Sequence, residues 1–413
     1  MNSADATIDH LSLNRATDDD WDDIIAADAR AFAMRNPIPD DERDDLRAKV
    51  SDSDVIVVRD TDVSSVPLVG VSMFYRMSMT LPGGAVADAA GLSWVSVAAT
   101  HRRRGILRRM LTELTRQWID EGQTFAILTA SEGTIYERFG FGPACFAHSI
   151  RIGSSARMRA EHPSHATVRF AHPDEVAAAV ADIHHRWTAT RPGALARTEQ
   201  WWAPILADRD SERPPAASGL HYLLHDDGYA SYRVFKGVAD GEVHAEIEEV
   251  VAVTEDAHTD LWRVLISLDL IPTLHASIPV DDPLPRKLLN LRSVEVTGLV
   301  DKMWLRILDV PAALGARRYD ADLDVVLEVG DRFAGRGGTF ALTVRNGAAV
   351  VVHSEAQPTV RLDTSVLSSL YLGGISAHEF AAAGRLWTDS PATLDALDRA
   401  FATTRAPFAG TFF

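Results

Sequence analysis

The hydrophobic positions of the first 147 residues follow the spacings of alternating strands and helices. Apolar side chains recur at helical spacing over residues 18–33, within an otherwise acidic segment, and this predicts an amphipathic helix. A second amphipathic helix is predicted from Gly105 to Asp120, where apolar residues fall at i, i+3/i+4 and i+7. Residues 1–147 are therefore expected to form one α/β unit. Short apolar runs predict its strands at residues 54–59, 69–75, 92–97 and 125–129.

The same patterns divide the rest of the chain into two further units, so that the predicted fold class is α+β in three parts. The second unit is expected at 148–303 and the third at 304–413, where strands come first and helices after. The second unit is predicted to contain helices near 174–188 and 260–269 and strands at 222–224, 229–234 and 243–253. The third is predicted to contain strands at 323–329, 339–344 and 348–353 and helices at 364–371, 377–382 and 391–402.

Composition narrows the classes of function. A chain of 413 residues with 46% hydrophobic and 24% charged residues is long enough for two or three globular cores. The segment Met1–Asp9 lacks the features of a signal peptide and no apolar run is long enough to span a bilayer. We therefore expect a cytoplasmic protein that does not bind membranes. The single cysteine, Cys145, excludes an internal disulfide and fits a reducing compartment.

Charge indicates the kind of partner. A formal net charge of −17 disfavours nucleic acid and favours a cationic partner, although acidity also serves solubility. Residues 18–45 hold 11 acidic residues against three arginines, which suits either amine binding or a solvated helix face. The 15 histidines show no metal-ligand spacing with cysteine or carboxylates, so no metal is expected.

The strongest chemical signal lies where the strand that ends at Val97 turns into the helix that begins at Gly105. Three consecutive arginines, Arg102, Arg103 and Arg104, occupy this turn. Unpaired backbone N–H groups, the positive end of the helix and the guanidinium groups would then converge on one point, which suits a pyrophosphate. A solvated basic turn is the alternative, but arginines oppose the helix dipole at this end and cost stability there without an anion.

A second signal lies downstream, in the segment Ser131–Phe141. Ser131 is a suitable cap for a short helix, Tyr136 would lie on its second turn, and Gly140 would end it. A phenol of pKa about 10 next to a leaving thiolate supplies the proton that acyl transfer from a thioester requires. An ordinary packing role for this tyrosine is the alternative.

These two segments resemble the GNAT superfamily of acetyltransferases, whose signature is a Gln/Arg-x-x-Gly-x-Gly/Ala turn after a strand and a Tyr-x-x-x-Gly-Phe segment downstream. The matching stretches are 102–107 and 136–141, with Leu107 in place of the usual small residue. Further stretches are similar to the Eis (enhanced intracellular survival) family and span all three units. They are residues 100–105, 129–133, 281–285, 305–307, 310–314 and 370–373.

The resemblance implies a GNAT domain, a second GNAT-like domain, a C-terminal domain with a sterol-carrier-like fold, and a homo-hexamer. It implies acetyl-CoA as co-substrate and small cationic amines such as aminoglycosides as acceptors. Tyr136 would be the general acid, and the terminal carboxylate of Phe413 would lie in the active site and help to deprotonate the amine. The residues expected to bind acetyl-CoA are Val95, Ser96, Val97, Arg102, Arg103, Arg104, Gly105, Ile106, Leu107 and Ser131.

The acceptor is less closely defined. The family comparison places Trp21, Phe32 and Trp94 near the acceptor pocket, and aromatic rings offer walls and cation–π contacts to amines. Phe412 stands where the family has an acidic residue, and no acid fills the first-helix position near Met34. Polyamines and protein lysines are therefore further candidate acceptors, and an acyl-CoA or lipid sensor without turnover is the non-enzymatic alternative.

Two other segments carry predictions. The two terminal phenylalanines indicate a docked chain end, for which hydrophobic packing alone is the simpler explanation. Residues 251–262 repeat the strand-turn-helix layout of 95–107, but acids replace the arginines and the glycine is missing. We expect a duplicated domain there that has kept the fold and does not bind a pyrophosphate.

Overall fold

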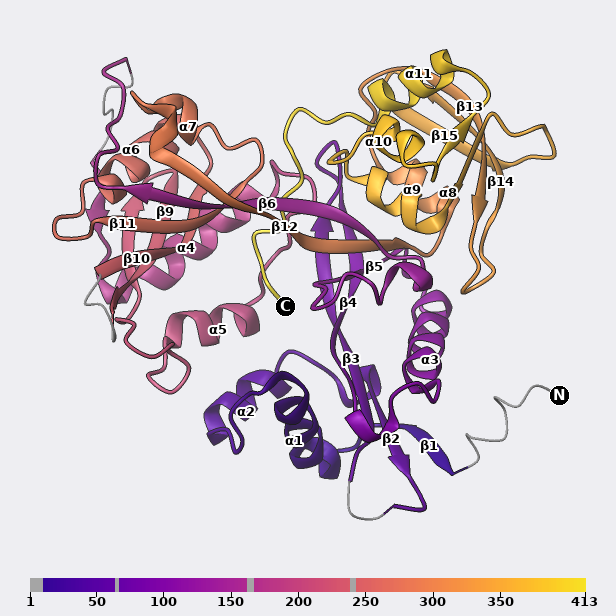
Figure 1. Cartoon of the computed structure of the whole chain (residues 1–413), viewed down its shortest axis with the longest axis horizontal. Coiled ribbons are helices and arrows are strands. Elements are labelled where there is room, and N and C mark those ends of the chain that lie inside the picture. Colours follow the sequence, from indigo (N-terminus) through magenta and orange to yellow (C-terminus); the bar gives the residue numbers. More distant parts are fainter. Residues whose placement is uncertain (1–9, 64–66, 162–166, 238–242) are drawn as a thin grey trace.

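A computed structural model of the chain describes residues 10–63, 67–161, 167–237 and 243–413. The segment Met1–Asp9, for which the sequence predicts no signal peptide, lies outside these ranges. Figure 1 shows three units around a central region that contains the C-terminus. Within the described residues, the first two units share a single twelve-stranded sheet and the third has a five-stranded sheet of its own.

The N-terminal unit forms one end of the large sheet. Its strands lie side by side in chain order: β1 (Leu11–Arg15), β2 (Val55–Asp60), β3 (Gly70–Thr80), β4 (Val86–Val97) and β5 (Phe125–Leu128). Helices α1 (Trp21–Phe32) and α2 (Asp40–Arg47) pack on one face of these strands and α3 (Ile106–Asp120) packs on the other. Successive strand residues point to opposite faces, so alternate residues belong to two different cores. The two predicted amphipathic helices and the four predicted strands are confirmed, except that residues 18–20 form a 3₁₀ turn before α1.

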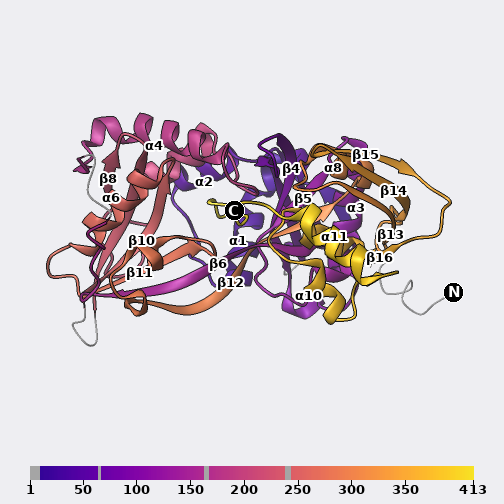
Figure 2. The same ribbon diagram turned by 90° about the horizontal axis from the view of Figure 1, so that it is seen from above.

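Two long strands join the first unit to the second. β12 (Val294–Ile307) pairs with β5, where Trp304 lies opposite Leu128, and along most of its length with β6 (Gly142–Gly153). Figures 1 and 2 show both strands running from the second unit toward the centre of the molecule. The sequence did not predict either strand. Three register shifts interrupt the pairing of β12, and these obscure its period of two.

The second unit continues the sheet beyond β6 in the order β11 (Thr273–Pro279), β10 (Val243–Ala252), β9 (Gly228–Lys236), β8 (His221–His225) and β7 (Arg169–Phe170). Its helices are α4 (Pro173–Thr188), α5 (Glu199–Ala207), α6 (Glu255–Ile266) and α7 (Leu284–Lys287). Helix α6 begins five residues before the predicted start at 260. The reason is local, since the Thr254 hydroxyl accepts the N–H of Ala257 and two acids stabilise the first turn.

The third unit has a sheet of order β15 (Ala348–His353), β14 (Gly338–Arg345), β13 (Leu323–Gly330), β16 (Val360–Asp363) and β17 (Trp387–Thr388). Its helices are α8 (Val310–Ala316), α9 (Thr364–Tyr371), α10 (Ala377–Ala382) and α11 (Pro391–Phe401). The predicted alternation of its strands and the positions of its later helices are confirmed. Helix α9 is buried along its length and packs on β6 and β12, which fixes this unit against the large sheet.

The described ranges contain no helix that is long and apolar enough to cross a bilayer. Within the same ranges, no three His, Cys, Asp or Glu side chains are grouped so as to hold a metal ion. The thiol of Cys145 is fully buried, and burial raises its pKa far above the usual value, so the thiolate is suppressed.

Candidate active site

The strands β4 and β5 separate at the centre of the first unit. They pair in parallel only from Ala89 to Leu92 on β4, so residues 93–97 have no strand partner on the β5 side. Ala98 N–H points to the β3 side, where it donates at 2.9 Å to the carbonyl of Val69, the residue before β3. Because successive N–H groups of a strand alternate in direction, those of Val97 and Val95 point to the open edge. The gap therefore presents unused backbone donors.

A β-bulge lies at the start of this open edge. Met73 of β3 pairs with Ser93 and Val71 with Ser96, so β4 carries one more residue than β3 between these pairs. Trp94 takes a left-handed conformation there, with φ of 52°, which is uncommon for a bulky residue. The bulge turns the β4 backbone away from regular pairing next to the gap.

The arginine turn leads from β4 into α3 as the sequence predicts. Arg103 (φ 65°) and Gly105 (φ 80°) both adopt left-handed conformations, and Gly105 immediately precedes the helix. The first-turn N–H groups of α3 lack intrahelical acceptors. Within the described residues, the side chains of Arg102, Arg103 and Arg104 form no ion pair or hydrogen bond with another residue. Guanidinium groups and free N–H donors therefore meet at this corner.

A buried hydrogen bond that the sequence did not predict fixes the turn. His101 Nε2 lies 3.0 Å from the Asp60 carboxylate at the end of β2, and both side chains are almost fully buried. The bond to His101 holds the pKa of Asp60 below its usual value. Because the two residues are 41 positions apart, only the pairing of the sheet reveals this contact.

Tyr136 lies on the α3 side of the sheet, but not on the predicted helix. Residues 131–135 form turns, Ser131 is exposed and caps no helix, and Tyr136 itself precedes a 3₁₀ turn, Glu137–Phe139, that ends at Gly140. The predicted end at Gly140 is confirmed by its left-handed φ of 82°. Tyr136 is 6% exposed in the core that contains Leu92 and Ile106. Burial, aided by the Glu132 charge, raises its pKa to about 12.

The C-terminal tail is docked, as predicted, on the opposite side of the sheet. Phe413 is 9% exposed, and its Cε2 lies 3.1 Å from where a Cβ on Gly91 of β4 would stand. Its ring belongs to the core on the α1 side, with Ala89. The tail is tied by a hydrogen bond from Leu195 N–H to Ala409 O at 3.0 Å. Tyr136 and Phe413 thus flank the separated strands from opposite faces.

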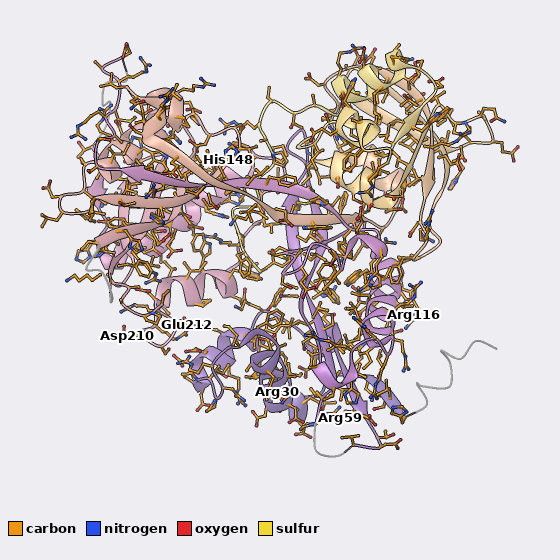
Figure 3. All side chains as sticks on the ribbon, in the orientation of Figure 1. Arg30, Arg59, Arg116, His148, Asp210 and Glu212 are labelled. Atoms are coloured by element: carbon orange, nitrogen blue, oxygen red, sulfur yellow. The ribbon has the colours of Figure 1, made fainter. Side chains whose placement is uncertain are left out.

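A cavity of about 650 Å³ lies between the second unit and the tail. It is bounded by α5 and the loop after it, by β10 and β11, and by residues 409–412. Figure 3 shows Glu212, one of its wall residues, between α5 and α2. Both basic and acidic side chains line the cavity. The basic ones are Lys49, Arg191, Arg197, Arg209, Arg233, Lys302 and Arg405, and the acidic ones are Asp208, Glu212, Glu248, Glu249, Glu255 and Asp282.

The three units match known domain families. Residues 12–144 and 193–307 each match an acetyltransferase (GNAT) domain, and residues 310–410 match a sterol carrier protein domain. N-acetyltransferase Eis of Mycobacterium tuberculosis is 39% identical over 401 residues, which cover 95% of this chain and 97% of that protein. The chain belongs to the Eis family of N-acetyltransferases.

Other relatives of this Eis-family enzyme agree. An uncharacterized N-acetyltransferase of Streptomyces coelicolor is 34% identical over 387 residues, covering 89% of this chain and 91% of that protein. The crystal structure of Eis1 from Mycobacterium abscessus matches with a TM-score of 0.83 at 29% identity, covering 97% of this chain and 100% of that one. The predicted family, α+β fold class, acetyltransferase activity and acetyl-CoA co-substrate are therefore confirmed.

The groups at the Eis-family arginine turn fit acetyl-CoA. A diphosphate requires cations and free N–H donors, and the turn presents both without internal partners. Ile106 and Leu107 turn their side chains into the core below the turn, so only their backbone faces a ligand. Val95 and Val97 likewise pack on the α3 side and leave backbone N–H groups at the open edge. Ser96 is 7% exposed.

The aromatic residues expected near the acceptor lie in different places. Trp21 is 2% exposed in the α1 core and donates its indole N–H to Asp52 at 2.8 Å, which leaves no surface for an acceptor. Phe32 is 43% exposed at the end of α1, and Trp94 is half-buried at the bulge. None of the three lines the large cavity. The aromatic residues that do are Trp187, Trp201, Trp262, Phe408 and Phe412.

One acidic residue near this region, Asp28, was not predicted from the sequence to have a functional role. Asp28 lies half-buried on α1, and burial raises its pKa to about 6. Its charge, added to the effect of burial, raises the pKa of Tyr75, whose ring packs edge-on against Trp201 at 5.1 Å. Trp201 lines the cavity. Many neighbouring acids are paired with arginines, whereas Asp28 has no ion pair within the described residues.

The corresponding corner of the second unit has acids where the first unit has arginines, and Lys287 pairs with one of them. Lys287 Nζ lies 2.9 Å from the Glu255 carboxylate and 3.2 Å from the Glu255 carbonyl at the start of α6. It also lies 3.1 Å from Nδ1 of His258. The carboxylates of Glu255 and Asp256 in the first turn of α6 would repel an anion, which supports the expected loss of pyrophosphate binding.

Proposed function

We propose that this enzyme transfers the acetyl group of acetyl-CoA, held at the turn from Arg102 to Ile106, to an amino group of a small cationic acceptor. The observation that carries the proposal is the open edge of β4, which joins the two faces of the sheet. Tyr136 flanks it on the α3 face and Phe413 on the α1 face. Donor and acceptor would then approach the same point from opposite sides, as direct transfer requires.

The proposed steps use groups on both faces. The Phe413 carboxylate first takes a proton from the acceptor ammonium, and the neutral amine nitrogen then attacks the thioester carbon. The nitrogen of the tetrahedral intermediate gives its second proton to solvent. The Val97 N–H, at the open edge, stabilises the negative charge that develops on the carbonyl oxygen. The C–S bond then breaks and the Tyr136 phenol protonates the departing thiolate. Its raised pKa keeps that phenol protonated at neutral pH.

The acceptor is proposed to be an aminoglycoside or a polyamine. The cavity beside the tail is large enough for such molecules, and its aromatic and acidic walls suit ammonium groups. Its arginines are largely paired with its acids, as Arg197 is with Glu249 and Arg233 with Asp208. Asp28 does not line this cavity, but its charge acts on Tyr75, whose ring packs on the cavity residue Trp201. We assign to Asp28 the binding of an ammonium group of an acceptor that reaches beyond the cavity toward α1. Protein lysines are the second candidate, and a deep cavity favours a small molecule over them.

Thiol release from acetyl-CoA with aminoglycosides, polyamines and a lysine peptide tests this proposal. We expect turnover with at least one small amine and little with the peptide. Tyr136→Phe should lower kcat about 100-fold or more while acetyl-CoA affinity changes little. Near-normal turnover would remove Tyr136 from the acid role, and binding of acetyl-CoA without turnover for any amine would favour a sensor.

A cytoplasmic homo-hexamer is proposed as the working form. Exposed apolar side chains are concentrated between residues 289 and 300, on β12 and the segment before it, and such a concentration marks an interaction surface. They are Leu289, Leu291, Val296, Leu299 and Val300. A second copy of the chain would bury them.

A further inference from the structure

The turn that begins at Tyr136 is held from outside by the sterol-carrier-like unit and by the end of β12. Arg306, which is fully buried, donates from Nη1 to the carbonyl of Phe139 and from Nη2 to Asp331 at 2.8 Å. A Cβ on Gly140 would stand only 1.7 Å from this guanidinium. The Arg306 guanidinium is therefore in direct contact with the backbone of the turn.

The loop between β13 and β14 completes this contact. Asp331 accepts the N–H groups of Phe333 and Ala334, each at 3.1 Å, and so shapes the loop around the arginine. The Phe333 ring packs edge-on against Phe139, with centroids 4.9 Å apart, and the guanidinium of Arg108 lies 5.5 Å from the centroid of the same ring. A residue of the third unit thus stands between the first turn of α3 and the tyrosine turn.

A second contact comes from the far side of the same unit. Arg385, between α10 and β17, forms an ion pair with Glu137, the residue after Tyr136. Its other nitrogen donates to Ser365 at 2.9 Å, so the pair connects the turn to α9. Three side chains therefore contact the turn at Glu137, Phe139 and Gly140. They belong to Arg306, Phe333 and Arg385.

The Tyr136 side chain itself has few fixed contacts. Within the described residues its hydroxyl has no hydrogen-bond partner, and its ring meets Phe141 at a centroid distance of 6.2 Å. Where the hydroxyl lies is therefore set by the backbone from which it projects. A shift of about 1 Å in such a group is enough to cost up to about 100-fold in rate.

We propose that the sterol-carrier-like unit serves as the support that positions Tyr136, with Phe333, Asp331 and Arg385 as positioning residues alongside Arg306. This inference rests on the proposed role of Tyr136 as general acid. It gives the third unit a part in acetyl transfer that does not depend on binding a lipid. Removal of a contact should loosen the turn and slow thiolate protonation, while the diphosphate site remains intact.

The test uses two partly accessible contacts, because breaking the buried Arg306–Asp331 pair is expected to unfold the protein. Phe333→Ala and Arg385→Gln should each lower kcat about five- to ten-fold and leave KM for acetyl-CoA within about two-fold. Arg361→Gln is the matched control, since this arginine of β16 pairs with Glu328 away from the turn. It should leave both constants unchanged.

A double-mutant cycle distinguishes positioning from general damage. In a Tyr136→Phe background, Phe333→Ala and Arg385→Gln should have no further effect on kcat, because they act through the missing hydroxyl. Full additivity of the effects, or wild-type kcat in both single variants, would overturn the inference. If Tyr136→Phe alone retains normal turnover, it is the proposed acid role that fails, and the two failures are therefore separable.

Discussion

Arg197 binds the C-terminal tail through Thr411, with its Nε donating to the threonine Oγ1 at 3.0 Å. Its Nη2 donates to the Gly410 carbonyl at 2.7 Å and pairs with Glu249 of β10. Tyr229 donates its hydroxyl to the same Glu249 at 2.7 Å. The second unit therefore holds the tail two residues before Phe413.

The first prediction concerns Thr411→Val, which keeps the shape of the side chain and removes the hydroxyl. Loss of this hydrogen bond, worth about 1 kcal/mol, should loosen the docking of Phe413 and lower kcat a few-fold without changing KM for acetyl-CoA. Thr411→Ser retains the hydroxyl and is the matched control. Steady-state kinetics with a fixed amine measures the effect, and equal kcat in both variants would detach the tail from catalysis.

The second prediction concerns the arginine turn. Arg103→Gly removes a guanidinium without straining the backbone, because glycine readily takes the φ of 65° found there. If Arg103 contacts the diphosphate, KM for acetyl-CoA should rise about ten-fold, and salt should affect the variant less than the wild type.

Arg116→Ala provides the control for this change. Arg116 lies on the outer face of α3, where it pairs with Glu113 and Asp120 (Figure 3). The KM of the Arg116→Ala variant for acetyl-CoA should stay within about two-fold of the wild-type value. An unchanged KM for Arg103→Gly at low salt would show that the diphosphate binds elsewhere.

Features that depend on local sequence were predictable. The stripe of α3, the turn at Arg102 and the alternation of β13 each follow from residues that are close in the chain. The helix expected from the Ser131 cap to Gly140 was wrong over residues 131–136, because a capping serine and a terminating glycine say nothing about the residues between them. Gly133 and Thr134, which favour turns over helix, lie there.

Features that depend on distant pairing were not predictable. The placement of β12 beside β5 joins residues 176 positions apart at Trp304 and Leu128, and no local pattern encodes it. The contacts of Arg306 and Phe333 with the tyrosine turn follow from that pairing. Asp28 was missed for a related reason. It is one of 11 acids between residues 18 and 45, and no local pattern shows that its pKa is the one that burial raises.

The third prediction concerns assembly. Leu299 is 62% exposed on β12, and a charge placed there should prevent a second copy from covering this surface. Leu299→Glu is therefore expected to shift the particle in light scattering from six chain masses toward smaller species. Val350→Glu is the control, because Val350 is 65% exposed on β15 of the third unit. A wild-type mass for Leu299→Glu would exclude this surface as an interface.

The fourth prediction concerns Asp28, whose pKa burial raises to about 6. Below that pH the carboxyl is neutral and cannot hold an ammonium group, so kcat/KM for the acceptor should fall as one proton binds. Asp28→Asn should lower kcat/KM about ten-fold at pH 7.5 and abolish this acidic limb, leaving KM for acetyl-CoA unchanged. Asp19→Asn, at an exposed position of the same segment, should behave as wild type.

The same substitution should stabilise the protein, and the sign follows from proton linkage. The folded state binds a proton at Asp28 more tightly than the unfolded chain, whose aspartate has the ordinary pKa of 3.8. The contribution to stability is therefore greatest below pH 3.8 and is lost as the pH rises through about 6. At pH 7.5 the buried charge costs about 1 to 2 kcal/mol after solvent screening, and Asp28→Asn removes that cost. A higher Tm together with weaker acceptor binding in Asp28→Asn would show that Asp28 serves function at the expense of stability. A lower Tm would contradict the statement that the charged carboxylate destabilises the folded state.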